Sequence, residues 1–182
     1  MGRRRSGARI AVVALALSGC ATVEEPAATS TIRELIVTSS DAVADCAAML
    51  WPVDGPLSSG FGRREGKTHD GIDLAVAEDT PVRAACDGVV AYAGDGMHGY
   101  GNLVVLRHAG ALATLYAHNR ELLVRQGDAV ARGQVIARSG ATGRVTAPHL
   151  HFEVRLGNSP VNPHPYLTRS AMLLPVKPDL PF

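Results

Sequence analysis

The sequence predicts an all-β domain, built as a sandwich or as a partly open barrel of short strands. Nineteen glycines and eleven prolines among 182 residues place turns at short intervals and leave few long apolar periods. From Trp51 onward, short apolar segments are separated by Gly, Asp and Asn at nearly every junction. The hydrophobic fraction of 46% is that of a globular chain long enough to bury a core. A net charge of +1, with scattered basic residues, gives no electrostatic reason to expect binding to nucleic acid.

Residues 1–19 have the pattern of a secretory signal peptide. Three arginines at positions 3–5 precede an apolar run over residues 8–18, which is too short to span a bilayer permanently. The run ends in Leu17-Ser18-Gly19-Cys20, which resembles a bacterial lipobox and implies cleavage before Cys20 and attachment of lipid to that cysteine. The alternative is an ordinary signal peptide that ends near a cysteine.

Residues 20–50 are expected to connect the lipid to the folded domain. Acyl chains on Cys20 would hold the protein at a membrane surface. Ala21 rather than Asp follows this cysteine, which in a Gram-negative cell resembles lipoproteins of the outer membrane, so we expect a protein of the cell envelope that faces the periplasm. Val23–Ser30 is polar, small and proline-bearing, as a tether would be. Thr31–Met49 has the spacing of a short amphipathic helix.

Residues 51–166 form the predicted folded domain, and the proline-rich residues 167–182 follow it as a tail. Each expected strand is short, carries β-branched or other apolar residues, and is bounded by turn-forming residues. The expected strands are Leu57–Phe61, Gly71–Ala75, Pro81–Ala85, Gly88–Tyr92, Leu103–His108, Ala111–His118, Ala129–Ala131, Val135–Ser139 and His149–Leu156.

Two segments carry candidate metal ligands. His149 and His151 lie on one face of a predicted strand, because side chains alternate there with period two. Together with His69 and Asp73, one member of this pair would supply two imidazoles and one carboxylate, a set typical of catalytic zinc. Four steps along a regular strand span roughly 13 Å, so we expect the backbone to bend at Gly71, between His69 and Asp73. Spacing alone does not decide which of His149 and His151 binds the metal.

The motifs His69–Asp73, Tyr116–His118 and Pro148–Glu153 resemble those of the lysostaphin/LytM-type zinc metallopeptidases, family M23. The resemblance runs from about Trp51 to about Tyr166, and several ordered motifs over most of a domain are far more specific than one His-x-His pair. It implies a lysostaphin/LytM-like fold of the barrel-sandwich hybrid kind. The connecting segments that share it are Ser59–Arg64, Asp87–Val90 and Gly99–Asn102.

The resemblance also implies a role for each of five side chains. His69, Asp73 and His151 would be the ligands of one Zn²⁺ per chain, whereas His118 and His149 would be the catalytic pair that does not bind the metal. A zinc ion polarises a carbonyl and lowers the pKa of water, and a nearby imidazole can accept the proton of that water. A second imidazole can donate a hydrogen bond to the developing oxyanion. The sequence leaves open which imidazole does which.

Three further residues are candidates for substrate contact. Tyr116 precedes His118 by two positions, so on a regular strand it faces the same side and could orient substrate, although it could equally pack in the core. Asn102 and Arg64 belong to family-like motifs, where they could contact substrate or stabilise turns.

The remaining histidines and cysteines have expected structural roles. His98 is expected in a loop near the rim of the cleft, and His108, at the end of an apolar strand, within the fold. Once Cys20 carries lipid, Cys46 and Cys86 remain. Export to an oxidising compartment allows a disulfide between them, but the expectation favours two buried free thiols.

The function that these features predict is a zinc endopeptidase that cleaves peptide stems or cross-links of bacterial peptidoglycan, the substrate class being implied by the resemblance. The alternative is a LytM-like regulator that activates a partner cell-wall amidase, with an amidase or the divisome as its partner. Such regulators have usually lost the metal residues, whereas all five positions are filled here. A third hypothesis, a lipoyl- or biotinyl-type carrier, comes from the turn-rich segment Leu122–Gly140. The sequence does not support this hypothesis, because a carrier domain has a lysine at a tight hairpin tip and the corresponding segment, Gly140–Arg144, has none.

Overall fold

The computed structural model describes Cys46, residues 48–64 and residues 66–168. The predicted signal peptide, Cys20, the tether, most of the predicted helix and the tail from residue 169 onward lie outside this part of the chain, as does the side chain of Arg64. The described part is almost entirely β, with one 3-10 turn, η1 (His164–Tyr166). No helix in that part is long and apolar enough to cross a membrane.

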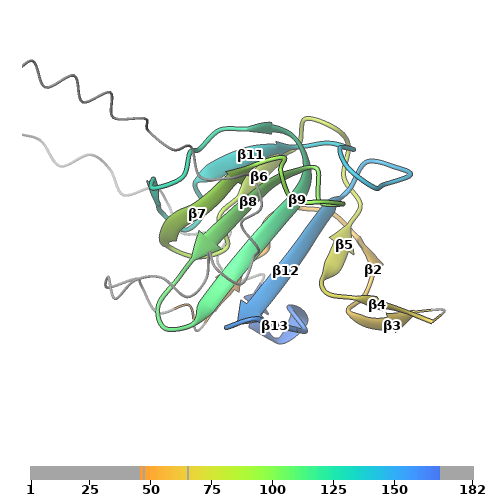
Figure 1. Cartoon of the computed structure of the whole chain (residues 1–182), viewed down its shortest axis with the longest axis horizontal. Coiled ribbons are helices and arrows are strands. Elements are labelled where there is room, and N and C mark those ends of the chain that lie inside the picture. The colour runs from red at the N-terminus through yellow and green to blue at the C-terminus, as the bar shows by residue number, and fades with distance from the viewer. Residues whose placement is uncertain (1–45, 47, 65, 169–182) are drawn as a thin grey trace, which may run out of the picture.

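Ten strands pair into one antiparallel sheet (Figure 1). The main path follows the order β10 (Ala129–Val130), β7 (Gly88–Gly94), β8 (Asn102–Arg107), β9 (Leu112–Leu122), β12 (Leu150–Leu156), β5 (Ile72–Leu74) and β2 (Leu57–Ser59). Beside this path, β11 (Val135–Ser139) pairs with β9 and with β6 (Pro81–Arg83), and β13 (Ser159–Val161) pairs with β12. Two small sheets complete the fold, a parallel pair of β1 (Met49–Leu50) with β14 (Leu167–Thr168) and a hairpin of β3 (Gly62–Arg64) with β4 (Lys67–His69).

The eleven-residue strand β9 organises the sheet. It pairs with β8 and with β12, so that Tyr116 lies opposite both Val104 and Phe152. Beyond the end of β12, strand β9 continues to Leu122 and pairs with β11, which leads to β6. The sheet therefore curls, but among the described strands its path runs from β10 to β2 without closing. The prediction of an all-β, partly open architecture is confirmed.

Apolar residues cover both faces of this sheet. Tyr116, Phe152 and Leu106 belong to a larger buried cluster, whereas Leu115 and Val105, one position away along their strands, belong to a smaller one. This alternation follows from the period of two along a strand. Burying a side chain as large as Phe152 stabilises the fold by about 1.5–3 kcal/mol relative to exposing it. Packing on both faces fixes β9 and β12, which position the site described below.

Cys46 and Cys86 form a disulfide, and the expectation of two free thiols is therefore wrong. The backbone N–H of Leu50 donates to the carbonyl of Ala85 over 2.8 Å, so the chain that enters the domain runs beside the segment that follows β6. The two cysteines consequently approach to a Cα–Cα distance of 5.8 Å, which is within the range that a disulfide requires. This proximity depends on contacts 40 residues apart in sequence, which no local pattern reveals.

Candidate metal centre

A break between β4 and β5 brings His69 and Asp73 together. Strand β4 ends at His69 and β5 begins at Ile72, with a bend at Gly71. A Cβ atom on Gly71 would overlap the carbonyl oxygen of Phe152 and would lie 3.0 Å from Cε1 of His151, so only glycine permits this close approach to β12. As a result, Nε2 of His69 and Oδ1 of Asp73 lie 3.0 Å apart.

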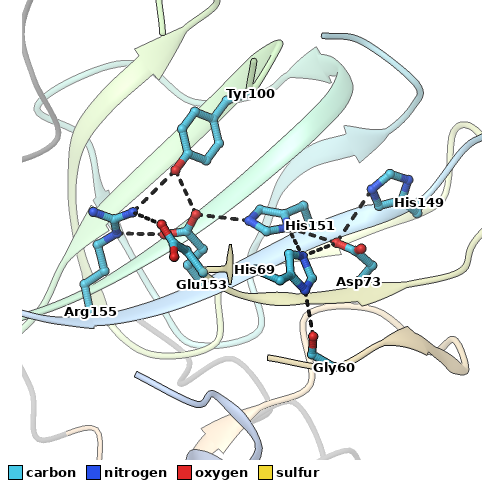
Figure 2. Close-up of polar contacts among 9 residues, drawn as sticks. Gly60, His69, Asp73, Tyr100, His149, His151, Glu153 and Arg155 are labelled. Atoms are coloured by element: carbon cyan, nitrogen blue, oxygen red, sulfur yellow. Dashed lines mark hydrogen bonds and ion pairs between the residues drawn. The ribbon is translucent and has the colours of Figure 1, made fainter. Parts of the chain in front are cut away.

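The third donor comes from β12. Asp73 and His151 are directly opposite each other in the β5–β12 pairing, and Nδ1 of His151 lies 2.8 Å from Oδ1 of Asp73 (Figure 2). Nε2 of His69 and Nδ1 of His151 are 3.1 Å apart, which completes a triangle of donor atoms. In a tetrahedral zinc site with bonds of about 2.0–2.2 Å, neighbouring donors are roughly 3.3 Å apart. Residues His69, Asp73 and His151 therefore fit a zinc ion with little movement.

The other nitrogen of each ligating imidazole has a partner of its own. Nδ1–H of His69 donates to the carbonyl of Gly60 over 2.7 Å. Nε2–H of His151 donates to Oε1 of Glu153 over 3.0 Å. These bonds leave the remaining nitrogen of each ring directed at the centre of the triangle, as metal-binding histidines require.

Charges at the centre shift the pKa values of its members. Burial lowers the pKa of His151, but hydrogen bonds to Asp73 and Glu153 outweigh it and raise the value to about 9. For Asp73, burial raises the pKa, but the hydrogen bond from His151 and the charges of the surrounding histidines outweigh it, so the pKa lies below its usual range. Asp73 is therefore a carboxylate, ready to bind a cation, at neutral pH.

Two more imidazoles flank the triangle. The rings of His118 and His149 have centroids 4.9 Å apart, and the His118 ring lies 5.8 Å from that of His151. Nδ1–H of His118 donates to the carbonyl of Thr142 over 2.9 Å, so its Nε2 carries the lone pair. Burial lowers the pKa of His118 to about 4, with the hydrogen bond to Thr142 acting in the opposite direction. His149 donates from Nδ1 to the carbonyl of Ala147, and its Nε2 lies 3.7 Å from Oδ1 of Asp73.

His118 reaches the cleft because its backbone departs from the regular strand. Ala117 lies opposite His151 and Tyr116 lies opposite Phe152, so regular alternation would turn His118 toward the Tyr116 side. The φ angle of His118 is +64°, in the left-handed region that non-glycine residues adopt rarely and often at functional sites. This conformation rotates the imidazole to the side of His151.

Tyr116 is a core residue, and the prediction that it faces the same side as His118 is wrong. Its side chain is fully buried, and its ring packs against Phe152. The backbone N–H of Ala85 donates to its hydroxyl over 2.8 Å, and that hydroxyl is also hydrogen-bonded to Thr114. Burial raises the pKa of Tyr116 to about 12. With no exposed surface, Tyr116 cannot contact substrate in this structure.

Asn102 also has a structural position rather than one facing the cleft. Its Nδ2 donates to the carbonyl of Arg120, and its backbone N–H donates to Oγ1 of Thr142, both over 3.0 Å. These bonds connect β8 to the end of β9 and to the loop between β11 and β12. The backbone of Arg64 lies in β3, and its side chain is outside the described part of the structure.

The metal centre lies in an open cleft of about 820 Å³. Its lining includes His98, Tyr100, Arg144 and His149. The position of His98 at the cleft agrees with the expectation from sequence. A cleft of this size admits a peptide segment to the three donor atoms.

Comparison with known proteins places this site in a family. Residues 67–163, more than half of the chain, match the family model described as Peptidase family M23. The chain belongs to peptidase family M23. It is 40% identical over 141 residues to the "Murein hydrolase activator NlpD" of Salmonella dublin, which covers 78% of this chain and 37% of that relative. It is 47% identical over 113 residues to the "DD-carboxypeptidase/endopeptidase Mpg" of Neisseria meningitidis, which covers 59% of this chain. That match spans 26% of the Neisseria protein, so this M23 chain matches well under half of either relative.

Solved structures of M23 proteins share the fold. The catalytic domain of lysostaphin from Staphylococcus simulans matches with a TM-score of 0.59 and 32% identity, over 62% of this chain and 92% of that one. A zinc-containing peptidase from Vibrio cholerae matches with a TM-score of 0.59 and 40% identity, over 63% of this chain and 39% of that one. The predicted lysostaphin-like fold is confirmed.

Proposed function

We propose that this M23 protein is a zinc-dependent endopeptidase that hydrolyses peptide bonds of bacterial peptidoglycan. One observation carries the proposal: the donor atoms of His69, Asp73 and His151 converge to within 2.8–3.1 Å of one another in an open cleft. Two further imidazoles stand beside them. A relative named as an endopeptidase and a zinc-containing structural neighbour support the same function.

The metal chemistry would take place at this triangle of donor atoms. A zinc ion bound to Nε2 of His69, Oδ1 of Asp73 and Nδ1 of His151 would act as a Lewis acid toward a peptide carbonyl and toward water. The bonds from His69 to Gly60 and from His151 to Glu153 hold both ligating nitrogens toward the cleft.

His118 is suited to accept a proton. Its lowered pKa keeps the ring neutral at physiological pH, and its Nδ1–H is held by the carbonyl of Thr142. The lone pair on Nε2 is therefore free to take the proton of an attacking water and to pass it to the leaving amine.

His149 is suited to stabilise negative charge. Its Nε2 lies 3.7 Å from Oδ1 of Asp73, so this nitrogen faces the metal centre. A proton carried on this nitrogen could be donated in a hydrogen bond to the oxyanion that forms at the attacked carbonyl.

A second candidate function is activation of another cell-wall hydrolase, such as an amidase. It is favoured by the relative that matches the chain over 141 residues, because that protein is named a murein hydrolase activator. In this role the cleft or its rim would contact a partner enzyme, and hydrolysis by the chain itself would not be needed. We further propose that lipid on Cys20 anchors the protein in the cell envelope, where either function would meet peptidoglycan. Cys20→Ser should then release the protein from the membrane fraction.

Digestion of intact peptidoglycan sacculi separates the two functions. The purified chain is incubated with sacculi, with and without a chelator, and the soluble fragments are identified by mass spectrometry. New peptide ends that require the metal and that disappear in His118→Ala support the endopeptidase. Release of material only when a purified amidase is added, equally by wild type and by His118→Ala, would contradict it and support the activator.

A further inference from the structure

Glu153 is a buried carboxylate with three polar partners. Its side chain is fully buried, although it belongs to β12, two residues beyond the candidate ligand His151. Oε1 accepts hydrogen bonds from Nε2–H of His151 over 3.0 Å and from the hydroxyl of Tyr100 over 2.8 Å. Oε2 accepts a hydrogen bond from Nε–H of Arg155 over 2.7 Å (Figure 2). Burying a carboxylate costs free energy unless it is paired in this way. A carboxylate buried beside a candidate metal ligand therefore needs a functional explanation.

The position of Glu153 determines which nitrogen of His151 faces the cleft. Residues 151 and 153 leave the same face of β12, because they are two positions apart on a strand. The carboxylates of Asp73 and Glu153 lie at opposite nitrogens of the His151 ring. The form of His151 that can bind a metal is the neutral imidazole, which carries one proton, and Glu153 holds that proton at Nε2. Nδ1 then keeps its lone pair directed toward Asp73 and His69.

We propose that Glu153 is a positioning residue that fixes the tautomer and orientation of His151 for metal binding, and that Tyr100 and Arg155 hold its carboxylate in place. This inference rests on the metal site of the proposed function but not on peptide hydrolysis.

Tyr100 extends this network to both halves of the site. Its hydroxyl donates to Glu153, while its backbone carbonyl accepts the N–H of His118 over 2.8 Å. The same residue therefore contacts the support of a metal ligand and the backbone of the candidate proton acceptor. A displacement of Tyr100 would move His151 and His118 together.

Arg155 connects the network to the segment that carries the first ligand. Besides its bond to Glu153, its guanidinium lies 3.8 Å from Oδ2 of Asp70, the residue after His69. The same amino group, Nη2, also donates to the Tyr100 hydroxyl over 3.4 Å. Arg155 thus balances the negative charge of the Glu153 carboxylate. Its contacts to Asp70 and Tyr100, which both border the cleft, hold the guanidinium in place beside that carboxylate.

The test measures zinc affinity rather than turnover. The zinc dissociation constant of the full chain is determined by competition with a chromogenic chelator for wild type, Glu153→Gln, Tyr100→Phe and Tyr92→Phe. Tyr92→Phe is the matched control, because the Tyr92 hydroxyl accepts the N–H of Gly96 in the same loop without reaching Glu153. We expect Glu153→Gln to weaken binding about 10- to 100-fold. We expect Tyr100→Phe to weaken it about fivefold, as loss of one hydrogen bond would, and Tyr92→Phe to leave it unchanged.

A spectroscopic measurement distinguishes positioning from a general loss of structure. In the zinc-loaded, ¹⁵N-labelled wild type, the proton of His151 should reside on Nε2 and exchange slowly with solvent. In Glu153→Gln this proton should exchange faster, while the backbone amides of β9 and β12 keep their wild-type protection. Unchanged affinity and unchanged exchange in Glu153→Gln would overturn the inference while leaving the metal site intact.

Two further outcomes are decisive. If Glu153→Gln does not fold, the comparison of Tyr100→Phe with Tyr92→Phe decides, and equal affinities in these two variants overturn the inference. If wild type itself binds no zinc, the metal site and the proposed function fail, and this inference fails with them.

Discussion

The environments of His108 and of the metal centre, on opposite faces of the same sheet, differ in whether a ring nitrogen is left facing a cleft. At His108, Nδ1–H donates to the carbonyl of Asp87 and Nε2 is hydrogen-bonded to Oγ1 of Thr114, each over 2.8 Å. The ring is buried, and the bonds continue from Thr114 to Tyr116. At the metal centre, His69 uses one nitrogen in the same way and turns the other into the cleft.

The difference shows that a histidine can bind a metal only if one of its ring nitrogens is left facing the cleft. His108 even has metal-binding neighbours, because Cys46 and Cys86 could complete a set of three ligands with it. The disulfide removes both thiolates, and Asp87 and Thr114 occupy both ring nitrogens. The His108 region is therefore a structural network, while the region of His69 is built to hold a cation.

The largest expected effect is the loss of zinc when the candidate ligand His151 is replaced, compared with replacement of His108. His151→Ala should abolish both zinc binding and hydrolysis, because it removes one of three donors. His108→Asn should keep the full zinc content, measured by elemental analysis after gel filtration. Full zinc content in His151→Ala, or loss of zinc in His108→Asn, would contradict the distinction between the two regions.

Replacement of His118 sharpens the distinction inside the site. Zinc should remain bound in His118→Ala, because its Nε2 is not among the three converging atoms. Turnover should fall about 10²- to 10⁴-fold, as expected for loss of a general base. Parallel measurement of zinc content and of fragment release from sacculi provides the check, and loss of the metal would show that a ligand has been misplaced.

Removal of the disulfide should affect stability without affecting the metal. Cys46→Ser/Cys86→Ser should lower the free energy of unfolding by about 2–4 kcal/mol, because it frees a loop of 40 residues in the unfolded chain. Urea denaturation of both proteins, with zinc affinity measured on the folded forms, tests this. An equal stability of the two proteins would count against the pairing of Cys46 with Cys86.

The smallest expected effect is the pH dependence of stability due to His108. Burial lowers its pKa, and the hydrogen bond to Asp87 opposes this only in part. Below the ordinary pKa of 6.5, the unfolded chain therefore binds more protons at this residue than the folded one. The contribution of His108 is intact above pH 6.5 and decreases as the pH falls toward the folded-state pKa. Wild type should lose more stability than His108→Asn between pH 7.5 and pH 5, and a difference that does not change with pH would contradict this.

Much of the fold could be predicted because the core strands are recognisable from their amino-acid composition. Strands such as β8 and β12 are apolar and bounded by turn residues, as the patterns require. The hairpin of β3 and β4 was not predicted, because Gly-Arg-Arg and Lys-Thr-His carry no apolar alternation. Strand β13 was missed for a similar reason, since it contains a proline.

The candidate site was predictable as a set of residues but not as a geometry. Motif order identified the five side chains that the structure gathers at the cleft. Periodicity placed Tyr116 beside His118, and it failed because a single positive φ angle at His118 reverses the alternation. Glu153 and Tyr100 stood within the quoted motifs, but nothing local indicated their bond, which spans 53 residues. Contacts of this kind depend on how distant segments pack together, and a local sequence pattern carries no information about that packing.

The covalent bond between Cys46 and Cys86 also has a mechanical consequence. It closes a ring of chain that contains both His69 and Asp73. If lipid on Cys20 tethers the protein as proposed, a pull on that tether passes through the sulfur atoms directly to Cys86, two residues before β7. The disulfide gives this pull a route that bypasses the backbone of the enclosed loop, so the tether cannot separate His69 from Asp73 by stretching the chain between the two cysteines.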